Sequence, residues 1–442
     1  MDQAQAGSST LRTRTFRLDR DVPIVEVGAR SGLLWSRGGF SLAGIGEAAR
    51  LPLDRSAHGG GGFGPTADAL AALVDPEPGD AAGPAGPGTG PVAFAALPFD
   101  PDAAGELVVP RVLVGANAAG VRWLSVTSQS AAAADASVAV RAAEAELDQL
   151  LATPGAATSA AATSASADPA DFRLRSVLPA EVWRDEVVAA ARDRIRDGEL
   201  VKAVLARELV LTTDRPIDPA AVVRRLAQVF PAAALFLVDD FVGASPELLV
   251  SRIDDVVRAH PLAGTAARST DPLIDQRNVG NLLASDKDRW EHRITIDWLL
   301  DTLLPFCSYV DAEPEPSIVT LANVHHLGTR VEGRLSSPAA PILELVAALH
   351  PTPAVGGSPA KDALAVIDEL ERAARGRYAG PTGWVDGAGN GEFAVAIRSA
   401  QLGGTEARFF AGVGVVGDSD PAAELAETRA KFRAMLGALI VP

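Results

Sequence analysis

The sequence has 442 residues, of which 56 are acidic and 40 basic, and its formal net charge at pH 7 is −16. This charge repels polyanions at long range, so no nucleic acid and no membrane surface is expected as a partner. Hydrophobic residues make up 48% and charged residues 22%, which is typical of a globular protein and excludes a largely disordered chain. The N-terminus lacks the apolar core of a signal peptide and no run of about 18 apolar residues occurs, so a cytoplasmic protein is expected.

The first part of the chain, residues 1–127, predicts mainly strands. Residues 16–55 alternate apolar and polar in short pieces separated by glycines, among them "VPIVEVG" at 22–28, which indicates antiparallel strands and turns. Further strands are expected in "PVAFAALPFD" and "ELVVPRVLVG". The glycine-rich stretch at 58–74 matches neither phosphate-binding loop nor dinucleotide fingerprint, so it is interpreted as a turn before a helix.

Residues 128–174 are rich in Ala, Ser and Thr and predict a low-complexity connector with one helix at 138–152. The second part, residues 175–442, alternates helical patterns with hairpin-like strands, which predicts an α+β fold rather than a doubly wound sheet. Its longest helix is expected at 286–306, and "GEFAVAIRSAQL" at 391–402 is expected to form one strand. Cys307 is the single cysteine and lies in an apolar run, so an internal disulfide and a cysteine-based zinc site are excluded and a buried, inert thiol is expected.

Two predicted helices carry acidic residues at helical spacing. Asp420 and Pro421 mark the start of the last helix, where Glu424, Glu427 and Lys431 would share one face. The long helix offers Asp288 and Glu291 with the same three-residue spacing. Carboxylates on separate helices are suitable ligands for a hard cation such as Mg²⁺, although solvated charge clusters would look the same.

Three charged residues interrupt otherwise apolar strands or turns. Lys202 opens the strand at 202–213, Glu247 stands in the turn "GASPELL", and Arg398 lies within the strand expected at 391–402. A charge in such a setting costs free energy unless it is paired or used, so each has either a structural partner or a catalytic role.

A series of motifs in the second part resembles the chorismate-utilising enzymes, and among them the isochorismate synthases. The motifs occur in the order of that family: "KAVLAR", "FVGASPELLV", "PLAGT", "SDKDRWEH", "VHHLGTRVEG", "LHPTPAVGGSP", "YAGPTGWVD", "GEFAVAIRSA" and "FAGVGVVGDSDPAAELAETRAKF". The resemblance runs from about residue 180 to the C-terminus, and the first 175 residues follow the family only in general plan. It implies that residues 1–442 form one α+β chorismate-binding unit, with antiparallel sheets surrounded by helices.

The resemblance also implies a role for each matching residue. Lys202 corresponds to the general base that activates water and Glu247 to the general acid that protonates the departing hydroxyl. Glu291 and Glu427 correspond to direct Mg²⁺ ligands, and Glu424 to a ligand acting through water. Tyr378 and Arg398 match the pair that holds the enolpyruvyl carboxylate. The remaining substrate-binding positions are Gly264, Thr265, His326, Gly414 and Lys431, while residues 350–359 wall the substrate ring. Ala266 departs from many relatives, which have Arg there.

The expected reaction is the reversible, Mg²⁺-dependent conversion of chorismate to isochorismate. It requires a lysine whose pKa is lowered by burial or a nearby cation and a carboxylic acid whose pKa is raised. A salicylate synthase remains the alternative, because such enzymes share Lys202 and Glu247, although Ala354 favours release of isochorismate. Ala263 argues against an aminodeoxychorismate synthase of the type that uses a lysine nucleophile, because such enzymes have Lys at this position. Lys202 argues against an anthranilate synthase, because those enzymes lack this lysine base. A Mg²⁺-dependent hydrolase and a non-catalytic anion-binding module are the other classes considered. A monomer or weak homodimer is expected, and the product would feed menaquinone or a siderophore.

Overall fold

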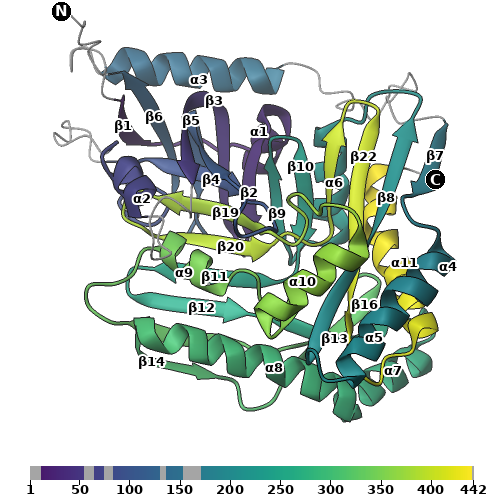
Figure 1. Ribbon diagram of the computed structural model, residues 1–442. Coiled ribbons are helices and arrows are strands. Elements are labelled where there is room, and N and C mark those ends of the chain that lie inside the picture. Colours follow the sequence, from purple (N-terminus) through teal and green to yellow (C-terminus); the bar gives the residue numbers. More distant parts are fainter. Residues whose placement is uncertain (1–10, 54–63, 74–82, 130–135, 153–170, 441–442) are drawn as a thin grey trace, which may run out of the picture.

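A computed structural model describes residues 11–53, 64–73, 83–129, 136–152 and 171–440 (Figure 1). Their strands form one sheet of 19 strands and a second sheet of three, and every pairing between strands of the described residues is antiparallel. Helices surround these sheets, so the predicted α+β class is confirmed. Residues 58–63 of the glycine-rich stretch and most of the predicted connector lie outside the described residues. None of the described helices has both the length and the apolar character needed to cross a membrane.

The strands are bounded as follows: β1 Leu11–Arg17, β2 Leu33–Arg37, β3 Phe40–Leu53, β4 Val92–Ala96, β5 Gly105–Ala116, β6 Arg122–Gln129, β7 Phe172–Ser176, β8 Lys202–Thr213, β9 Ala234–Val238, β10 Phe241–Ser245, β11 Leu248–Ile253, β12 Val256–His260, β13 Leu262–Ala267, β14 Cys307–Ala312, β15 Ser317–Thr320, β16 Val324–Gly328, β17 Val331–Leu335, β18 Gly357–Ser358, β19 Pro381–Asp386, β20 Gly391–Val395, β21 Ser399–Gly403 and β22 Glu406–Val415.

The helices are α1 Ile24–Ser31, α2 Gly64–Ala71, α3 Ala136–Ala152, α4 Ala180–Val182, the π-helical stretch η3 Trp183–Val188, α5 Ala189–Arg196, α6 Pro219–Val229, α7 Pro272–Ala284, α8 Asp286–Leu303, the short 3-10 helix η4 Leu304–Phe306, α9 Ile342–Leu349, α10 Ala360–Glu371 and α11 Pro421–Leu439.

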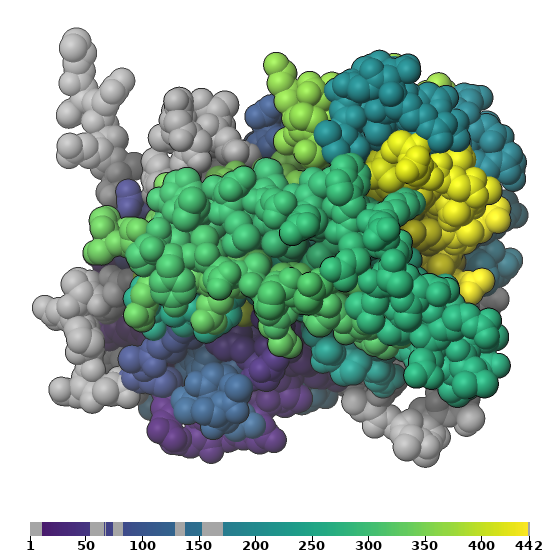
Figure 2. Space-filling model, turned by 90° about the horizontal axis from the view of Figure 1, so that it is seen from below, coloured from purple at the N-terminus to yellow at the C-terminus, as the bar shows by residue number. Residues whose placement is uncertain are grey.

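Strands from both parts of the chain share the large sheet. β2 pairs with β9 and β4 pairs with β19, so strands of the first part are hydrogen-bonded directly to strands of the second part. β8 and β22 form the longest pairing of the second part, with Ala203 opposite Val415 and Val204 opposite Gly414. The small sheet of β13, β15 and β16 lies beside α7 and α8 (Figure 1). Seen from below, residues of α7 and α8 cover much of one face, and α11 borders them (Figure 2).

One predicted strand segment is a helix. Residues 22–28 were expected to be extended, but Ile24–Ser31 form α1. Ile24, Val27 and Gly28 are buried on its inner side, and Gly32 ends the helix in the left-handed conformation. The apolar residues of this short segment fit a helical period as well as an alternating one, and the prediction was therefore wrong here. The absence of a side chain at Gly28 also lets α1 approach Leu34 closely, because a Cβ there would lie 2.8 Å from it.

The strand expected at 391–402 is interrupted. β20 ends at Val395 and β21 begins at Ser399, and Arg398 in between has a φ of 52°. This left-handed conformation is uncommon for a residue other than glycine. The expectation of one continuous strand is therefore wrong. Because of this break, the side chain of Arg398 lies in the cleft that is described below. A regular, fully paired strand would not require an arginine to reach the cleft.

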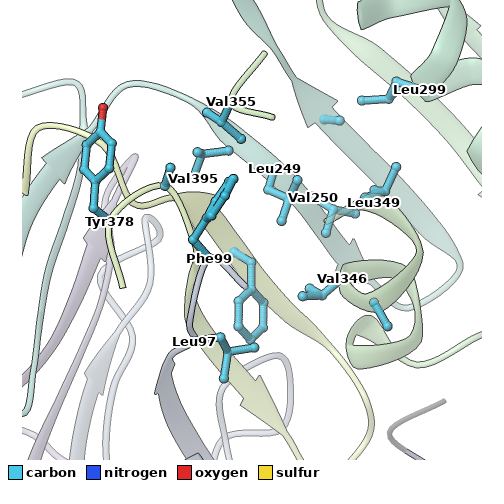
Figure 3. Packing of buried hydrophobic residues seen from close by; sticks show 14 of the residues in the cluster. Leu97, Phe99, Leu249, Val250, Leu299, Val346, Leu349, Val355, Tyr378 and Val395 are labelled. Carbon is cyan, nitrogen blue, oxygen red and sulfur yellow. The ribbon is translucent and has the colours of Figure 1, made fainter. Parts of the chain in front are cut away.

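A large hydrophobic core supports the centre of the molecule. In Figure 3, Leu249 of β11 lies near Val346 and Leu349 of α9, while Val355 and Tyr378 lie in the same cluster. Each fully buried aliphatic side chain of this kind stabilises the fold by about 1.5–3 kcal/mol. Cys307 is buried as expected, and burial raises the pKa of its thiol, which fits an inert residue. The cluster holds several segments that border the cleft in fixed positions.

Candidate active site

A cleft that opens to solvent, with about 710 Å³ of empty space when its open side is included, collects nearly all the residues that the sequence predicted to be functional. Its walls come from β8, β13, β16, β22, α8 and α11 and from the loops after β10, α9, α10 and β20. The predicted residues that line it are Glu247, Gly264, Thr265, Glu291, His326, Tyr378, Arg398, Gly414, Glu424, Glu427 and Lys431. Lys202 is the remaining predicted residue, and it reaches this group through Glu291. The structure thus brings together positions that are up to 229 residues apart in sequence, from Lys202 to Lys431.

Lys202 is held in the wall of the cleft by Glu291. Its side chain is fully buried at the start of β8, and Nζ lies 2.8 Å from Oε1 of Glu291 on α8. Gly414 on the neighbouring strand β22 makes this contact possible, because a Cβ at that position would lie 2.3 Å from Glu291 Oε1 and 3.0 Å from Lys202 Cε. The ammonium group therefore has a defined position at the cleft.

Glu247 has the environment of a general acid. It lies in the turn between β10 and β11, is 3% exposed, and lines the cleft. Burial raises the pKa of its carboxyl group to about 7, although the backbone N–H of Leu262 and the positive charges of Arg398 and Lys202 act in the opposite direction. The direction of this shift confirms the expectation from the sequence. A carboxyl group with such a pKa can hold a proton near neutral pH and donate it.

Arg398 presents a buried cation to the cleft. Its Nη2 donates to Nε2 of His326 at 2.8 Å, and its Nε has no hydrogen-bond partner among the described residues. Burial and the charge of Arg398 lower the pKa of His326 well below its usual value, so the ring is neutral. Nδ1 of His326 then carries the proton and donates to the carbonyl oxygen of Gly264 at 3.1 Å. This chain orients the guanidinium group and leaves it able to bind a carboxylate.

Tyr378 and Gly264 complete this side of the cleft. The Tyr378 ring stacks on Phe410 with 5.1 Å between ring centres, and burial raises the pKa of its hydroxyl. The hydroxyl lies near Arg398, so the pair that the sequence predicted faces the same space. Gly264 has a φ of 75°, and a Cβ there would lie 3.1 Å from Cβ of Asp288. A larger residue would strain the backbone and narrow the cleft.

Four carboxylates and three lysines form a charged cluster at the cleft. Lys202 contacts Glu291, Lys287 contacts Glu424 at 3.2 Å, and Lys431 contacts Glu427 at 2.5 Å, so three of the chain's four lysines are used here. Asp288 is the fourth carboxylate. Burial, and then the charge of Glu427, raise the pKa of Glu424, and burial with the charge of Glu291 raises that of Asp288.

The donor set of this cluster fits Mg²⁺. Within the residues that the structure describes, no three His, Cys, Asp or Glu side chains lie close enough together to hold a metal ion. The carboxylates of the cluster form ion pairs with the lysines instead. However, Glu291, Glu424 and Glu427 project into one cleft from two helices, and burial together with the charge of Glu427 raises the pKa of Glu424. Oxygen ligands that repel one another are the arrangement that a hard divalent cation stabilises.

The loop at 350–359 forms part of the wall, as the sequence predicted. Ala354 and Val355 line the cleft, and Gly357 and Ser358 pair as β18 with Ala203 and Lys202 of β8. The wall that this loop presents is therefore apolar and is joined by backbone hydrogen bonds to the strand that carries Lys202.

Several residues of the site were not singled out from the sequence. Lys287, Val204, Ile397 and Gly412 line the cleft but were given no role. Lys287 lies within the quoted motif "SDKDRWEH", one helical turn before Glu291, and this spacing was the available signal. Gly412 accepts a hydrogen bond from Lys431 Nζ through its carbonyl oxygen at 2.8 Å, a contact that no local pattern indicates.

Comparisons with known proteins agree with this site. The isochorismate synthase DhbC of Bacillus subtilis is 44% identical over 279 residues, which cover 61% of this chain and 70% of the relative. The isochorismate synthase MenF of the same organism is 36% identical over 364 residues, covering 79% of this chain and 75% of the relative. These relatives confirm the resemblance found in the motifs.

Solved structures show the same fold. A protein named as the 2,3-dihydroxybenzoate-specific isochorismate synthase DhbC of Bacillus anthracis has a TM-score of 0.73 at 31% identity, over 93% of this chain and 96% of that protein. Anthranilate synthase component I of Streptococcus pneumoniae has a TM-score of 0.69 at 20% identity, over 95% and 93% of the two chains, and shows the fold alone. The family described as chorismate binding enzyme matches residues 29–440. The chain therefore belongs to the chorismate binding enzyme family.

Proposed function

We propose that this protein is an isochorismate synthase, which interconverts chorismate and isochorismate with the help of Mg²⁺. The observation that carries the proposal is that Glu247 and Arg398, whose Nε has no hydrogen-bond partner among the described residues, line one cleft, and that Lys202 contacts Glu291 of the same lining. The names of the similar proteins support the same assignment.

The charges of the cleft suit a substrate with two carboxylates. Arg398 and Tyr378 would bind the enolpyruvyl carboxylate, since a buried guanidinium group forms strong hydrogen bonds with a carboxylate. Glu291 and Glu427, with Glu424 acting through water, would hold Mg²⁺. The metal would supply a positive charge for the ring carboxylate, which the carboxylate cluster alone would repel.

The proposed reaction needs a base and an acid on the two sides of the ring. Lys202 takes a proton from water as the water oxygen forms a bond to ring C2. Both ring double bonds shift, from C1=C2 to C1=C6 and from C5=C6 to C4=C5, as the bond from C4 to its hydroxyl oxygen breaks. Glu247 donates its proton so that the group leaves as water. Base catalysis requires the free amine of Lys202, so its contact with Glu291 must be given up in the working enzyme, as metal binding by Glu291 would allow.

A salicylate synthase is the second candidate. Such an enzyme would also eliminate pyruvate, which requires the enolpyruvyl side chain to be held over the ring. Ala354 and Val355 offer only apolar contacts from the wall loop, which supports release of isochorismate instead. A non-catalytic anion-binding module would not need both Lys202 and Glu247 at this site. The presence of both residues therefore argues against that function.

Chromatography of a reaction over time tests the proposal. Purified protein with chorismate and Mg²⁺ near neutral pH should give a mixture of chorismate and isochorismate that is reached from either compound, with little salicylate. Salicylate and pyruvate formed together at the rate of chorismate loss would assign the salicylate synthase reaction instead. If chorismate binds but is not consumed, the protein is a binding module.

A further inference from the structure

Arg375 is a buried residue that lies outside the cleft but contacts two of its walls. It is 5% exposed and lies in the segment between α10 and β19. Its Nε donates to Oε2 of Glu371 at 2.9 Å and its Nη2 to Oε1 at 2.5 Å, so the two charges offset each other inside the protein. A guanidinium group has five donors, and this contact leaves others free for further acceptors.

The remaining donors of Arg375 join two separate segments. Nη1 donates to the carbonyl oxygen of Val355 at 2.8 Å, and Nη2 donates to that of Val204 at 2.6 Å. Val355 belongs to the wall loop 350–359, and Val204 follows Lys202 by two residues on β8. Both residues line the cleft. One side chain therefore fixes the apolar wall of the site relative to the strand that carries the proposed base.

Neighbouring contacts hold Arg375 itself in place. Phe99 covers the guanidinium group, with 4.1 Å between the carbon Cζ and the ring centre, and Phe99 and Val355 lie in the same core cluster (Figure 3). Glu371 also accepts a hydrogen bond from the backbone N–H of Ala206 on β8 at 2.7 Å. The Arg375–Glu371 pair thus contacts β8 at two points, and its geometry depends on several parts of the fold at once.

We propose that Arg375 is a positioning residue that sets the separation between the wall loop and the Lys202 strand. The catalytic consequence rests on the proposed function, whereas the structural one does not. The backbone hydrogen bond from Val204 N to Gly356 O, at 2.9 Å, connects the same two segments but leaves the carbonyl groups of Val204 and Val355 without a shared partner. The planar fork of an arginine bridges both carbonyls and a carboxylate, and a lysine ammonium cannot reproduce that arrangement.

Two variants test this proposal by hydrogen exchange. Arg375→Lys keeps the charge beside Glu371, and the double variant Arg375→Gln with Glu371→Gln removes both charges, so neither leaves a buried carboxylate unpaired. In each, backbone amides of residues 202–206 and 354–358 should exchange at least about tenfold faster than in the wild type, the scale of one lost charge-assisted hydrogen bond. Amides of β1 and β6, in the first part of the chain, should exchange as before.

Arg194→Lys provides a matched control. Arg194 forms a two-fold hydrogen-bonded pair with Glu369 on the same helix as Glu371, but that pair is exposed and does not contact the wall loop. The hydrogen-exchange pattern of the Arg194→Lys variant and its rate of chorismate turnover should equal those of the wild type. Unchanged exchange at both cleft segments in a folded Arg375 variant would overturn the proposal. A uniform increase over the whole chain would also overturn it, since that pattern marks a general loss of stability.

Kinetics provide the catalytic readout. The Arg375 variants should lose at least about tenfold in kcat, with a smaller change in KM for chorismate, because Arg398 and the Mg²⁺ that the cluster would hold would still bind the two carboxylates of the substrate. A change confined to KM would contradict the positioning role. If the wild type itself does not turn over chorismate, the proposed function fails, and hydrogen exchange still decides whether Arg375 joins the two segments.

Discussion

A Cβ atom on Gly414 would lie 2.3 Å from Oε1 of Glu291. A carbon and an oxygen in van der Waals contact do not approach so closely, so the carboxylate of Glu291 would have to move away from its place beside Lys202 if β22 carried a larger residue here. The close approach ties the sequence of β22 to the position of a carboxylate on α8.

Gly414→Ala should therefore displace Glu291 and Lys202 while leaving the sheet intact. The expected loss in kcat is roughly 10²-fold, the scale that accompanies a misplacement of about 1 Å at a catalytic group. Steady-state kinetics and circular dichroism provide the measurement. Gly403→Ala is the control, because a Cβ at Gly403 on β21 would meet no atom within 4 Å. Equal activity of the two variants would show that the contact between Gly414 and Glu291 is unimportant for turnover.

Lys202→Met tests the proposed base. Methionine keeps most of the volume of the buried chain but has no amine, so kcat should fall by roughly 10²-fold or more. Lys361→Met is the matched control, since Lys361 on α10 is exposed and lies outside the cleft. Turnover of chorismate is followed by chromatography for both. A Lys202 variant with nearly normal kcat would remove this residue from the mechanism.

The Glu247→Gln variant should be inactive. Its stability relative to the wild type should nevertheless increase as the pH rises. The pKa of Glu247 is about 7 in the folded protein, against an ordinary value of 4.5, so the folded state binds the proton more tightly than the unfolded chain. The free energy of unfolding of the wild type therefore falls between about pH 4.5 and pH 7. At about 1.4 kcal/mol per pH unit, this loss comes to between about 3 and 4 kcal/mol.

Glutamine does not titrate, so the difference in unfolding free energy between variant and wild type should increase over that pH range. Urea unfolding at pH 5 and pH 8 measures it. Glu344→Gln, at an acidic residue on α9 outside the cleft, is the control for the loss of one carboxylate. A difference that is the same at both pH values would mean that burial does not raise the pKa of Glu247.

Lys287→Met tests whether lysines compete with Mg²⁺ for the carboxylate cluster. Lys287 contacts Glu424 at 3.2 Å, and removing its charge leaves the cluster more negative. Mg²⁺ should then bind roughly tenfold more tightly in the absence of chorismate, as measured by titration calorimetry. Lys361→Met should bind Mg²⁺ as the wild type does.

Removal of the metal provides the corresponding activity test. Chelation with EDTA should abolish turnover in the wild type, and added Mg²⁺ should restore it. Weaker or unchanged Mg²⁺ binding by the Lys287 variant would show that Lys287 does not occupy a metal ligand. Full activity after exhaustive chelation would exclude the metal altogether.

The sequence predicted the parts of the site that depend on local spacing. The three- and four-residue intervals between Glu424, Glu427 and Lys431 are sufficient to place them on one face of α11, and the structure confirms this face at the cleft. The Asp420 side chain accepts a hydrogen bond from Ala422 N, as expected of the residue that begins this helix. Helical spacing is a local property, so one sequence is enough to read it.

Other features depend on contacts that no local pattern reveals. The pairing of Lys287 with Glu424 joins residues 137 positions apart. The left-handed backbone at Arg398 is imposed by its surroundings, because the neighbouring residues favour a continuous strand. In α1, the first turn could be read with either period, and only packing against β2 and β3 decides between them.

The pairing of β8 with β22 has a consequence for how the protein folds. Val204 lies opposite Gly414, so the strand with the proposed base is completed by a strand near the end of the chain. Closing so long a loop costs conformational entropy before its contacts contribute, and topologies of this kind fold slowly. During synthesis, Lys202 would leave the ribosome long before β22, the strand that pairs with β8. Recovery of activity should therefore be among the last events of refolding, and turnover would report completion of the native topology.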